Sequence, residues 1–267
     1  KITPSSLVPE EDQGTFLTAV TMDPGTSIKK TNESVSKIAR IITSQKGVRD
    51  CLYASGMDLL SNASSTSAGV IFTMLTDWDE RKTPDTAVTP ITMRVMGAGA
   101  QMITRGTVYA FGLPAISGLS LGGGVEGYLQ QTGDTNTAAL EAKAKEFVAA
   151  ALKRPEISYA RTTFDASTPQ MRMDVDEVKA LSLGVATSDI YTAISTTFNT
   201  FYVNDFSKAG RGFKVMLQAE DKYRAYPEQL NEVYVKSRNG SMLPLSAFVK
   251  FVPTVGPILI ERFNLFF

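Results

Sequence analysis

The sequence contains no histidine and a single cysteine, Cys51. The absence of histidine removes the general base of Ser-His-Asp and Cys-His catalysis and the commonest ligand of zinc and haem. One cysteine forms no disulfide within the chain, and its place in the segment VRDCLYAS is typical of a small buried strand residue rather than a reactive thiol. No catalytic constellation can be assembled, and the sequence predicts no enzyme, no metal site and no cofactor.

The sequence also has no excess of positive or negative charge and no long apolar run. The 267 residues carry 27 basic and 27 acidic side chains, so no basic surface for nucleic acid is expected. No apolar run reaches the ~18 residues that a membrane-spanning helix needs, and no signal peptide is apparent. The chain begins at Lys1 rather than Met and ends in the apolar ILIERFNLFF, which favours a piece cut from a longer chain.

Three local patterns could carry chemistry, and each has a simpler interpretation. Gly122 to Gly124 resemble a phosphate cradle, but a strand rather than a helix is expected to follow them. The acidic segments at 77–80 and 174–177 lack the spacing and central glycine of a calcium loop. Met171 and Met173 alternate on one predicted strand, where packing is favoured over the binding of a soft metal.

Periodic apolar residues in the first part of the chain predict alternating strands and helices. Ser27 is the expected N-cap of the first helix, whose apolar face includes Ile28, Val35, Ile38 and Ile42. In chain order we expect strand 15–22, a helix after Ser27, strands 48–55 and 69–75, a helix over 87–104, and strand 106–112. This βαββαβ order is the split-βαβ plan of a ferredoxin-like sandwich, in which two helices cover one face of a four-stranded sheet.

The segment between the two middle strands, SGMDLLSNASSTSAG at 55–69, combines two kinds of residue. Met57, Leu59 and Leu60 are apolar, whereas residues 61–68 are mostly small and flexible. A connector that merely turned the chain would be shorter and polar. The apolar residues therefore either contact a ligand or form a small satellite core beneath the loop.

A second round of the pattern follows the glycine-rich SGLSLGGG but stays incomplete. Its expected elements are strand 125–131, a helix over 137–153 and strand 157–164. The buried stripe of that helix would consist of Leu140, Phe147, Val148, Ala151 and Leu152. A segment with its own strands and helices follows, and a strand at 256–263 could rejoin the interrupted half. The order predicts an α+β chain in which one domain is inserted within another.

Six segments have a distinctive sequence, in this order along the chain: SLVPEEDQG (6–14), WDER (78–81), FGLPAISGLSLGGG (111–124), TPQMRMDVDEVKALSLGV (168–185), FYVNDFSKAGRG (201–212) and KYRAYPEQLNEVYVKSRNGSMLPLSAF (222–248). They resemble the second large periplasmic loop of the resistance-nodulation-division (RND) multidrug efflux transporters of the AcrB type. The resemblance covers essentially the whole chain. It implies a first porter subdomain at 1–117, a second, truncated one at 118–165 and 256–267, and an inserted docking or funnel subdomain at 166–255.

In that family the loop lies between transmembrane helices seven and eight of a pump in the inner membrane of Gram-negative bacteria. The resemblance implies a homotrimeric, proton-driven multidrug efflux pump that works with a periplasmic adaptor and an outer-membrane channel. This chain would supply the periplasmic porter and docking region, while the proton relay would lie in helices that it lacks. Hydrophobic or amphiphilic drugs would bind in a cleft gated by the 56–69 loop. The alternative is a protein–protein interaction or adaptor module built of ferredoxin-like domains.

The resemblance also implies which residues of this sequence line the cleft. Met57, Leu59 and Leu60 would belong to the gating loop, and Arg161 matches a polar residue at the pocket entrance. The flanking strands and the segment VEGYLQQ would add Tyr53, Phe72, Val125, Gly127 and Leu129. The family places aromatic residues where this chain has Met57, Leu59, Val125 and Gly127, so weaker stacking with a ligand is expected.

Asn239 and Gly240 lie between two strand-like runs in the segment SRNGSM. Asn-Gly at such a place predicts a hairpin with a type I′ turn, in which both central residues have positive φ. The matching hairpin of the family points toward the outer-membrane channel or its adaptor. The resemblance therefore makes Asn239 and Gly240 candidate docking residues, with a plain surface turn as the alternative.

Overall fold

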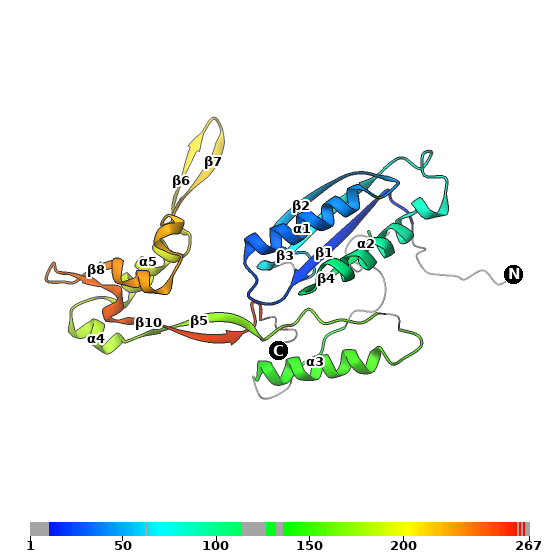
Figure 1. Cartoon of the computed structure of the whole chain (residues 1–267). Helices are drawn as coiled ribbons and strands as arrows, with labels where there is room; N and C mark the ends of the chain where they lie inside the picture. The colour runs from blue at the N-terminus through cyan, green and yellow to red at the C-terminus, as the bar shows by residue number, and fades with distance from the viewer. Residues whose placement is uncertain are drawn as a thin grey trace. The chain divides into compact units, whose positions relative to one another are not determined.

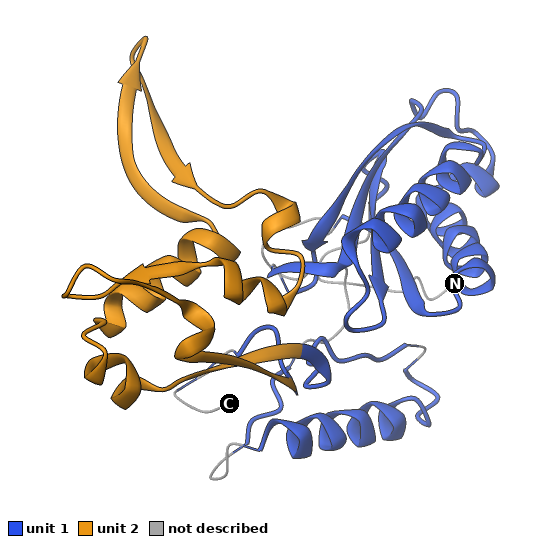
Figure 2. Cartoon of the chain, turned by 60° about the vertical axis from the view of Figure 1, so that its left-hand side comes forward, with its two compact units in different colours: residues 1–169, 255–267 blue, residues 170–254 orange. Residues whose placement is uncertain are grey.

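The computed structural model describes residues 11–61, 63–113, 127–131, 136–157 and 159–260, together with Arg262 and Asn264. The chain is a mixed α and β protein whose sheets include antiparallel strand pairs. It divides into two compact units: unit 1 comprises residues 1–169 and 255–267, and unit 2 comprises residues 170–254 (Figure 2).

Unit 1 contains a four-stranded sheet with the order β2-β3-β1-β4, in which each pair of neighbours is antiparallel. Its elements are β1 (Thr15–Met22), α1 (Ile28–Thr43), β2 (Val48–Asp58), β3 (Ala63–Leu75), the short 3-10 helix η1 (Pro84–Thr86), α2 (Val88–Met102) and β4 (Gly106–Gly112). This is the βαββαβ order that the periodicity predicts (Figure 1).

The main hydrophobic core lies between the two helices and one face of this sheet. Ser27 caps α1 as predicted, because its hydroxyl accepts a hydrogen bond from the backbone N–H of Lys30 at 3.4 Å. Ile28, however, is exposed in the first turn and does not join the buried face. The residues of this core are Phe16, Val20, Met22, Val35, Ile38, Ala39, Ile42, Ile71, Leu75, Val88, Ile91, Val95, Ile103 and Ala110. Burial of each large aliphatic side chain contributes about 1.5–3 kcal/mol.

A buried ion pair joins the segment before β1 to the connection between β3 and α2. The guanidinium of Arg81 donates to both carboxylate oxygens of Asp12, at 2.7 and 3.0 Å, and its Nε donates to the carbonyl of Thr76 at 2.7 Å. The indole N–H of Trp78 donates to the Asp12 carbonyl at 3.0 Å. Since the Arg81 side chain is 2% exposed, this pair is a structural tie rather than a surface contact.

Strands β2 and β3 continue beyond their predicted ends at 55 and 69, so most of the predicted 55–69 loop is strand. The pair Ser55–Gly69 is followed by the pair Met57–Ser64, and residues 65–68 therefore bulge out opposite Gly56 alone. Gly56 has φ +96°, a conformation that side chains disfavour. We call residues 57–64, which lie beyond this bulge, the tip hairpin. The loop prediction was wrong because small polar residues were taken to end a strand that backbone pairing continues.

Of the second, incomplete round of strands and helices predicted for residues 125–164, only a part is present. Helix α3 (Thr137–Ala151) forms as expected, but residues 127–131, 157 and 159–164 have no regular secondary structure, so the two predicted strands are wrong where they are described. The predicted stripe of α3 is likewise not buried, and Phe147 is 66% exposed. Among the described residues, no strand lies beside the helix to bury that stripe.

Unit 2 has a smaller core of its own, and the chain enters it along β5 (Thr168–Val175) and leaves along β10 (Val249–Gly256), which pair with each other. Because β10 ends at Gly256 and residues 257–260 have no strand, the predicted strand at 256–263 is wrong there. The core consists of Ala180, Val185, Ile190, Leu230, Val235, Leu245, Phe248 and Val249. The remaining elements are α4 (Glu177–Ser182), α5 (Thr187–Phe198), β6 (Phe201–Lys208), β7 (Arg211–Leu217), η2 (Asp221–Tyr223), η3 (Pro227–Glu232), β8 (Tyr234–Lys236), β9 (Met242–Pro244) and η4 (Leu245–Ala247).

The two hairpins of unit 2 use different turns. At the end of β6 and β7, Ala209 and Gly210 both have positive φ, as a type I′ turn requires. At 237–241 only Gly240 has positive φ, and its N–H donates to the carbonyl of Ser237 at 2.9 Å. The hairpin predicted there is present, but its type I′ turn is not, because Asn239 instead uses its side chain to accept from the N–H of Ser241.

Replacing Thr18 with valine is expected to raise the free energy of unfolding by about 1 kcal/mol. Thr18 is fully buried, pairs with Ile71 and Ala110 in the neighbouring strands, and its hydroxyl has no hydrogen-bond partner among the described residues. Valine keeps the shape and removes the cost of burying the hydroxyl. Urea unfolding measures the change, with Thr107→Val at an exposed position of β4 as the near-neutral control. A lower stability of Thr18→Val would contradict this account.

Replacing Asp12 with asparagine is expected to lower the free energy of unfolding by ~3 kcal/mol at neutral pH, because the buried guanidinium of Arg81 loses its charged partner. The hydrogen bond from Arg81 is the main cause that lowers the pKa of the Asp12 carboxyl below its ordinary value. The stabilisation is therefore complete above the unfolded-state pKa of about 3.9 and is lost as the pH falls through the lower folded-state pKa.

Fluorescence of Trp78, the single tryptophan of the sequence, would follow this unfolding. The difference between wild type and Asp12→Asn should shrink as the pH falls below about 4. Asp79→Asn, an exposed change in the same connection, is the control and should have little effect. A difference that does not depend on pH would rule out the charge of Asp12 as its cause.

Candidate cleft of unit 1

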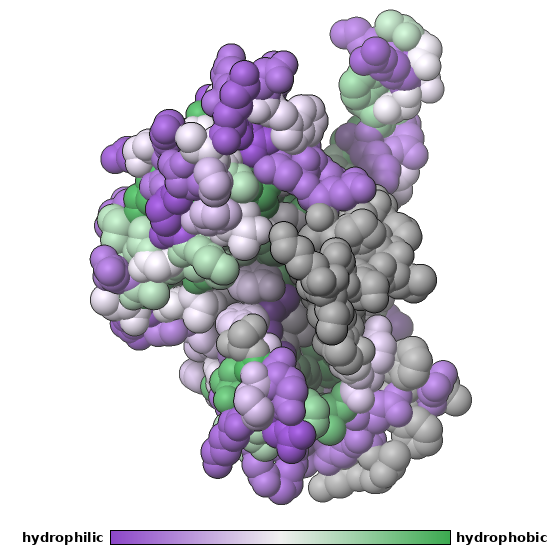
Figure 3. All heavy atoms as spheres, turned by 90° about the vertical axis from the view of Figure 1, so that its right-hand side faces the viewer, coloured by the Kyte–Doolittle hydropathy of each residue, from purple (hydrophilic) through white to green (hydrophobic). Residues whose placement is uncertain are grey.

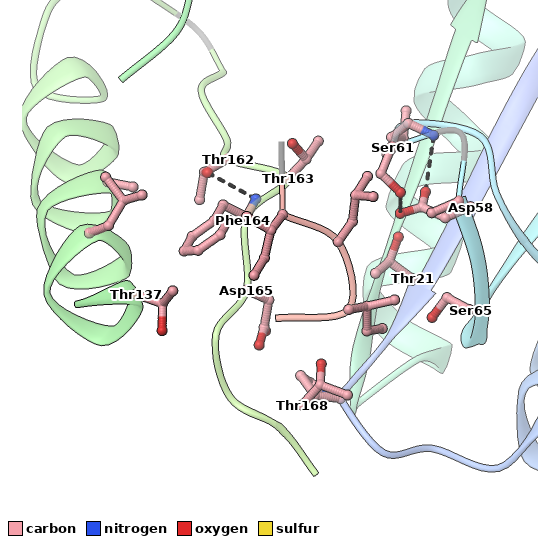
Figure 4. Close-up of a pocket in the computed structure, with 18 of the residues that line it drawn as sticks. Thr21, Asp58, Ser61, Ser65, Thr137, Thr162, Thr163, Phe164, Asp165 and Thr168 are labelled. Atoms are coloured by element: carbon pink, nitrogen blue, oxygen red, sulfur yellow. Dashed lines mark hydrogen bonds between the residues drawn. The ribbon is translucent and has the colours of Figure 1, made fainter. Parts of the chain in front are cut away.

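A cleft of about 1010 Å³ lies within unit 1 (Figure 4). Its walls come from six parts of the chain: the end of β1, the tip hairpin with the bulge behind it, residues 127–131, helix α3, residues 162–168, and residues 258–260 with Arg262. The volume is that of a site for a drug-sized molecule. Segments far apart in the sequence meet here, so the cleft exists only in the folded unit.

The tip hairpin brings Leu59 and Leu60 to one wall of the cleft. The carboxylate of Asp58 closes the turn on itself, because it accepts from the N–H of Leu60 at 3.0 Å and from the hydroxyl of Ser61 at 2.6 Å (Figure 4). The two leucines are thereby held at the end of an ordered turn. Met57 lies at the base of the tip hairpin and is not among the lining residues.

The wall on the other side is formed by residues 162–165, which lead into β5. Phe164 points toward α3, and its N–H donates to the hydroxyl of Thr162 at 3.2 Å (Figure 4). Asp165 accepts from both the N–H and the hydroxyl of Ser167, at 2.7 and 2.8 Å. These short-range bonds shape the backbone of the wall in the absence of a strand ladder.

Helix α3 supplies the floor between these walls through Leu140 and Ala144. Its buried Glu141 pairs with Lys145 at 2.5 Å and accepts from the N–H of Ala166 at 3.4 Å. The ion pair raises the pKa of the Lys145 ammonium, chiefly through the hydrogen bond to Glu141. Glu141 therefore fastens the helix to the end of the wall.

The lining combines apolar surface with hydroxyl groups. Aliphatic contacts are non-directional, and a hydroxyl rotates to donate or accept, so both tolerate ligands of many shapes. The serine and threonine hydroxyls are those of Thr21, Ser61, Ser65, Ser67, Thr137, Thr162, Thr163 and Thr168, and the charged residues are Asp58, Asp165 and Arg262. On the face of the molecule drawn in Figure 3, hydrophobic and hydrophilic residues are likewise interspersed.

Of the predicted cleft residues, Leu59, Leu60, Gly127 and Leu129 line this cleft. Val125 lies outside the described residues. Met57, Tyr53, Phe72 and Arg161 do not line it.

Tyr53 and Phe72 lie on opposite faces of the sheet. Tyr53 pairs with Ile71, which is in the core beneath the helices, whereas Phe72 pairs with Leu52. Directly paired residues share a face, and consecutive residues alternate between faces. The two side chains therefore cannot line one pocket from a single face, although both flank the same loop in the sequence.

Several lining residues have no counterpart among the predicted ones, notably Phe164, Tyr128, Leu140 and residues 258–260. Leu140 belonged to the predicted apolar stripe of α3, and Phe164 to a predicted strand, so their apolar character was visible. Nothing in the sequence indicated that they share a cavity, because the cavity forms between segments that are distant in sequence and partly lack a periodic apolar pattern.

Two kinds of feature are absent from the described part of the chain. Among those residues no three His, Cys, Asp or Glu side chains lie together as a metal site would require. Within the same ranges, every helix is too short or too polar to cross a bilayer. Asn239 and Gly240 are both exposed at their hairpin turn in unit 2.

Comparison with known proteins gives the family of the chain. The model of the AcrB/AcrD/AcrF family matches residues 1–267. The multidrug resistance protein MdtF of Escherichia coli is 33% identical over 264 residues, which cover 98% of this chain and 25% of MdtF.

Two further relatives show the same coverage. The multidrug export protein AcrF of E. coli is 33% identical over 265 residues, and the toluene efflux pump membrane transporter TtgB of Pseudomonas putida is 31% identical over 265. The chain spans about a quarter of the length of these relatives. By the match over its whole length, this chain belongs to the AcrB/AcrD/AcrF family.

Proposed function

We propose that this chain is the periplasmic porter and docking region of a proton-driven multidrug efflux pump in a Gram-negative inner membrane, and that the cleft of unit 1 binds hydrophobic or amphiphilic compounds. Relatives named for multidrug resistance and multidrug export support the efflux role over that of an adaptor module. The observation that carries the binding role is the cleft itself, where Leu59 and Leu60 of the tip hairpin share a drug-sized cavity with Phe164.

The size and lining of the cleft suit weak and adaptable binding. A compound that loses roughly 300 Å² of apolar surface there gains on the order of 7 kcal/mol at about 25 cal/mol per Å², before ordering costs are subtracted. Since this term has no preferred direction, compounds of different shape gain similar amounts. A transporter needs such reversible binding, because the compound must leave again.

The tip hairpin is the proposed gate of the cleft. Gly56 on one strand and the bulge at 65–68 on the other lie at its base. In the bulge, Ser67 donates from its N–H to the hydroxyl of Ser65 at 3.3 Å, so this bond is local rather than part of the ladder to β2. A backbone that is interrupted on both strands at one level suits a hinge for residues 57–64.

The units correspond to the proposed subdomains as follows. The ferredoxin-like porter subdomain would be built on residues 15–112, a proposal supported by the order β2-β3-β1-β4. Helix α3 and its flanking segments would belong to the second porter subdomain. Unit 2 would be the inserted docking subdomain, facing a periplasmic adaptor and an outer-membrane channel in a homotrimeric pump.

Truncation of the two lining leucines is expected to weaken the binding of a hydrophobic dye. Leu59→Ala and Leu60→Ala should each lower the affinity about fourfold, which corresponds to the loss of one buried carbon group from the contact with the dye at roughly 0.8 kcal/mol per group. Fluorescence titration of the chain with Nile red measures the change.

The matched controls are Met57→Ala and Leu52→Ala, which change apolar side chains of the neighbouring strand β2 that do not line the cleft. Both should bind the dye like the wild type. Equal losses in all four variants would point to a general change of the hairpin, and unchanged affinity in the two lining variants would reject the cleft as the binding site.

Cross-linking can test the docking role proposed for the 237–241 hairpin. In the full-length pump, a cysteine at Asn239, with Cys51 changed to serine, is expected to cross-link to the periplasmic adaptor or the outer-membrane channel. Lys208→Cys at the end of the other unit 2 hairpin is the control. Absence of cross-links from position 239, or equal yields from both positions, would favour a plain surface turn.

A further inference from the structure

The cleft wall at residues 162–165 is preceded by a segment that side chains, rather than strand pairing, attach to the sheet. The ring of Tyr159 stacks on the ring of Tyr109, with 5.0 Å between centroids and 9° between planes. The guanidinium carbon of Arg161 lies 5.2 Å from the centroid of the same Tyr109 ring. Two side chains of the segment therefore converge on one residue of β4.

Tyr109 is a rigid platform for these contacts. It lies in β4, one of the two edge strands of the four-stranded sheet, and pairs with Ala19 of β1. Its neighbour Ala110 is in the core, so Tyr109 points to the face away from the helices. The ring of Phe111 lies beside it with 5.2 Å between centroids.

The other end of the wall is fastened to α3. Ala166 is buried, and its N–H donates to the carboxylate of Glu141 at 3.4 Å. Between Arg161 and Ala166, residues 162–165 line the cleft. The sheet holds one end of this short wall and the helix holds the other.

We propose that Tyr109, Tyr159 and Arg161 form an aromatic clasp that positions the cleft wall, and that Arg161 acts on binding through Tyr109 rather than by touching the ligand. The proposal rests on the binding role proposed for the cleft. Arg161 was predicted from the resemblance as a contact residue, but the structure gives it a cation–π contact instead and no place in the lining.

The two possible roles of Arg161 differ in their dependence on ligand charge. If Arg161 positions the wall, Arg161→Met should lower the affinity for a cationic probe and for an anionic probe by the same factor of about threefold. The probes are rhodamine 6G and anilinonaphthalene sulfonate, respectively. Tyr109→Leu should do likewise, while Tyr109→Phe, which keeps the stack, should bind both probes normally. Addition of Arg161→Met to Tyr109→Leu should cause no further loss, since both changes remove one clasp. If Arg161→Met weakens binding of the anionic probe but leaves binding of the cationic probe unchanged or tighter, the proposal is overturned.

A second measurement tests the clasp without any ligand. Near-ultraviolet circular dichroism should change on Tyr109→Leu and on Tyr159→Leu, and the double variant should resemble the singles, because the stacked pair is lost in each. Tyr202→Leu in unit 2 is the control for the loss of a tyrosine. The unfolding of the Tyr109 and Tyr159 variants, followed by the fluorescence of Trp78, should differ little from that of the wild type. If the wild type binds neither probe, the proposed binding function fails while this spectroscopic comparison still decides the clasp. A spectrum that changes by no more than that of Tyr202→Leu would overturn it.

Discussion

The antiparallel pairing of β1 with both β3 and β4 is the constraint on which unit 1 depends. It places Phe16 and Val20 on the same face as Ile71 and Ala110, where the two helices cover them. A slip of one residue would turn this set toward the opposite face.

Two glycines allow the helices to approach the sheet closely enough to seal the core. A Cβ on Gly69 would come within 2.5 Å of Val35 in α1, and one on Gly99 of α2 within 2.5 Å of Val108 in β4. Both contacts are shorter than packed carbon atoms tolerate, so these positions require glycine in this packing. The register and the close packing together fix the frame from which the tip hairpin extends.

The cleft joins this rigid frame to segments that are held much more loosely. On one side, the tip hairpin continues β2 and β3 beyond the interruption at Gly56. On the other, residues 162–165 lie between the stacked tyrosines and Glu141, without strand pairing of their own. A rigid frame joined to walls without strand pairing suits the adaptable binding proposed for the cleft.

The chemical character of the cleft also differs from what the family resemblance suggested. The resemblance places aromatic residues at positions where this chain has aliphatic residues or glycine. The aromatic rings that line the cleft, Phe164 and Tyr128, come from other positions. In the proposed binding role, aromatic contact with a ligand would thus come from the wall and from residues 127–131 rather than from the proposed gate.

The sequence by itself determined the βαββαβ order, the cap at Ser27 and the helix at 137–151, because apolar period and capping chemistry are local properties. Motifs spread along its length also identified the family, which the comparison confirms. The tertiary structure decided those features that the local sequence pattern does not determine. Strand register separated Tyr53 from Phe72, backbone pairing turned a predicted loop into strand, and contacts between distant segments built the cleft. Each of these depends on which residues meet across the fold, and that is set by the packing of the whole unit.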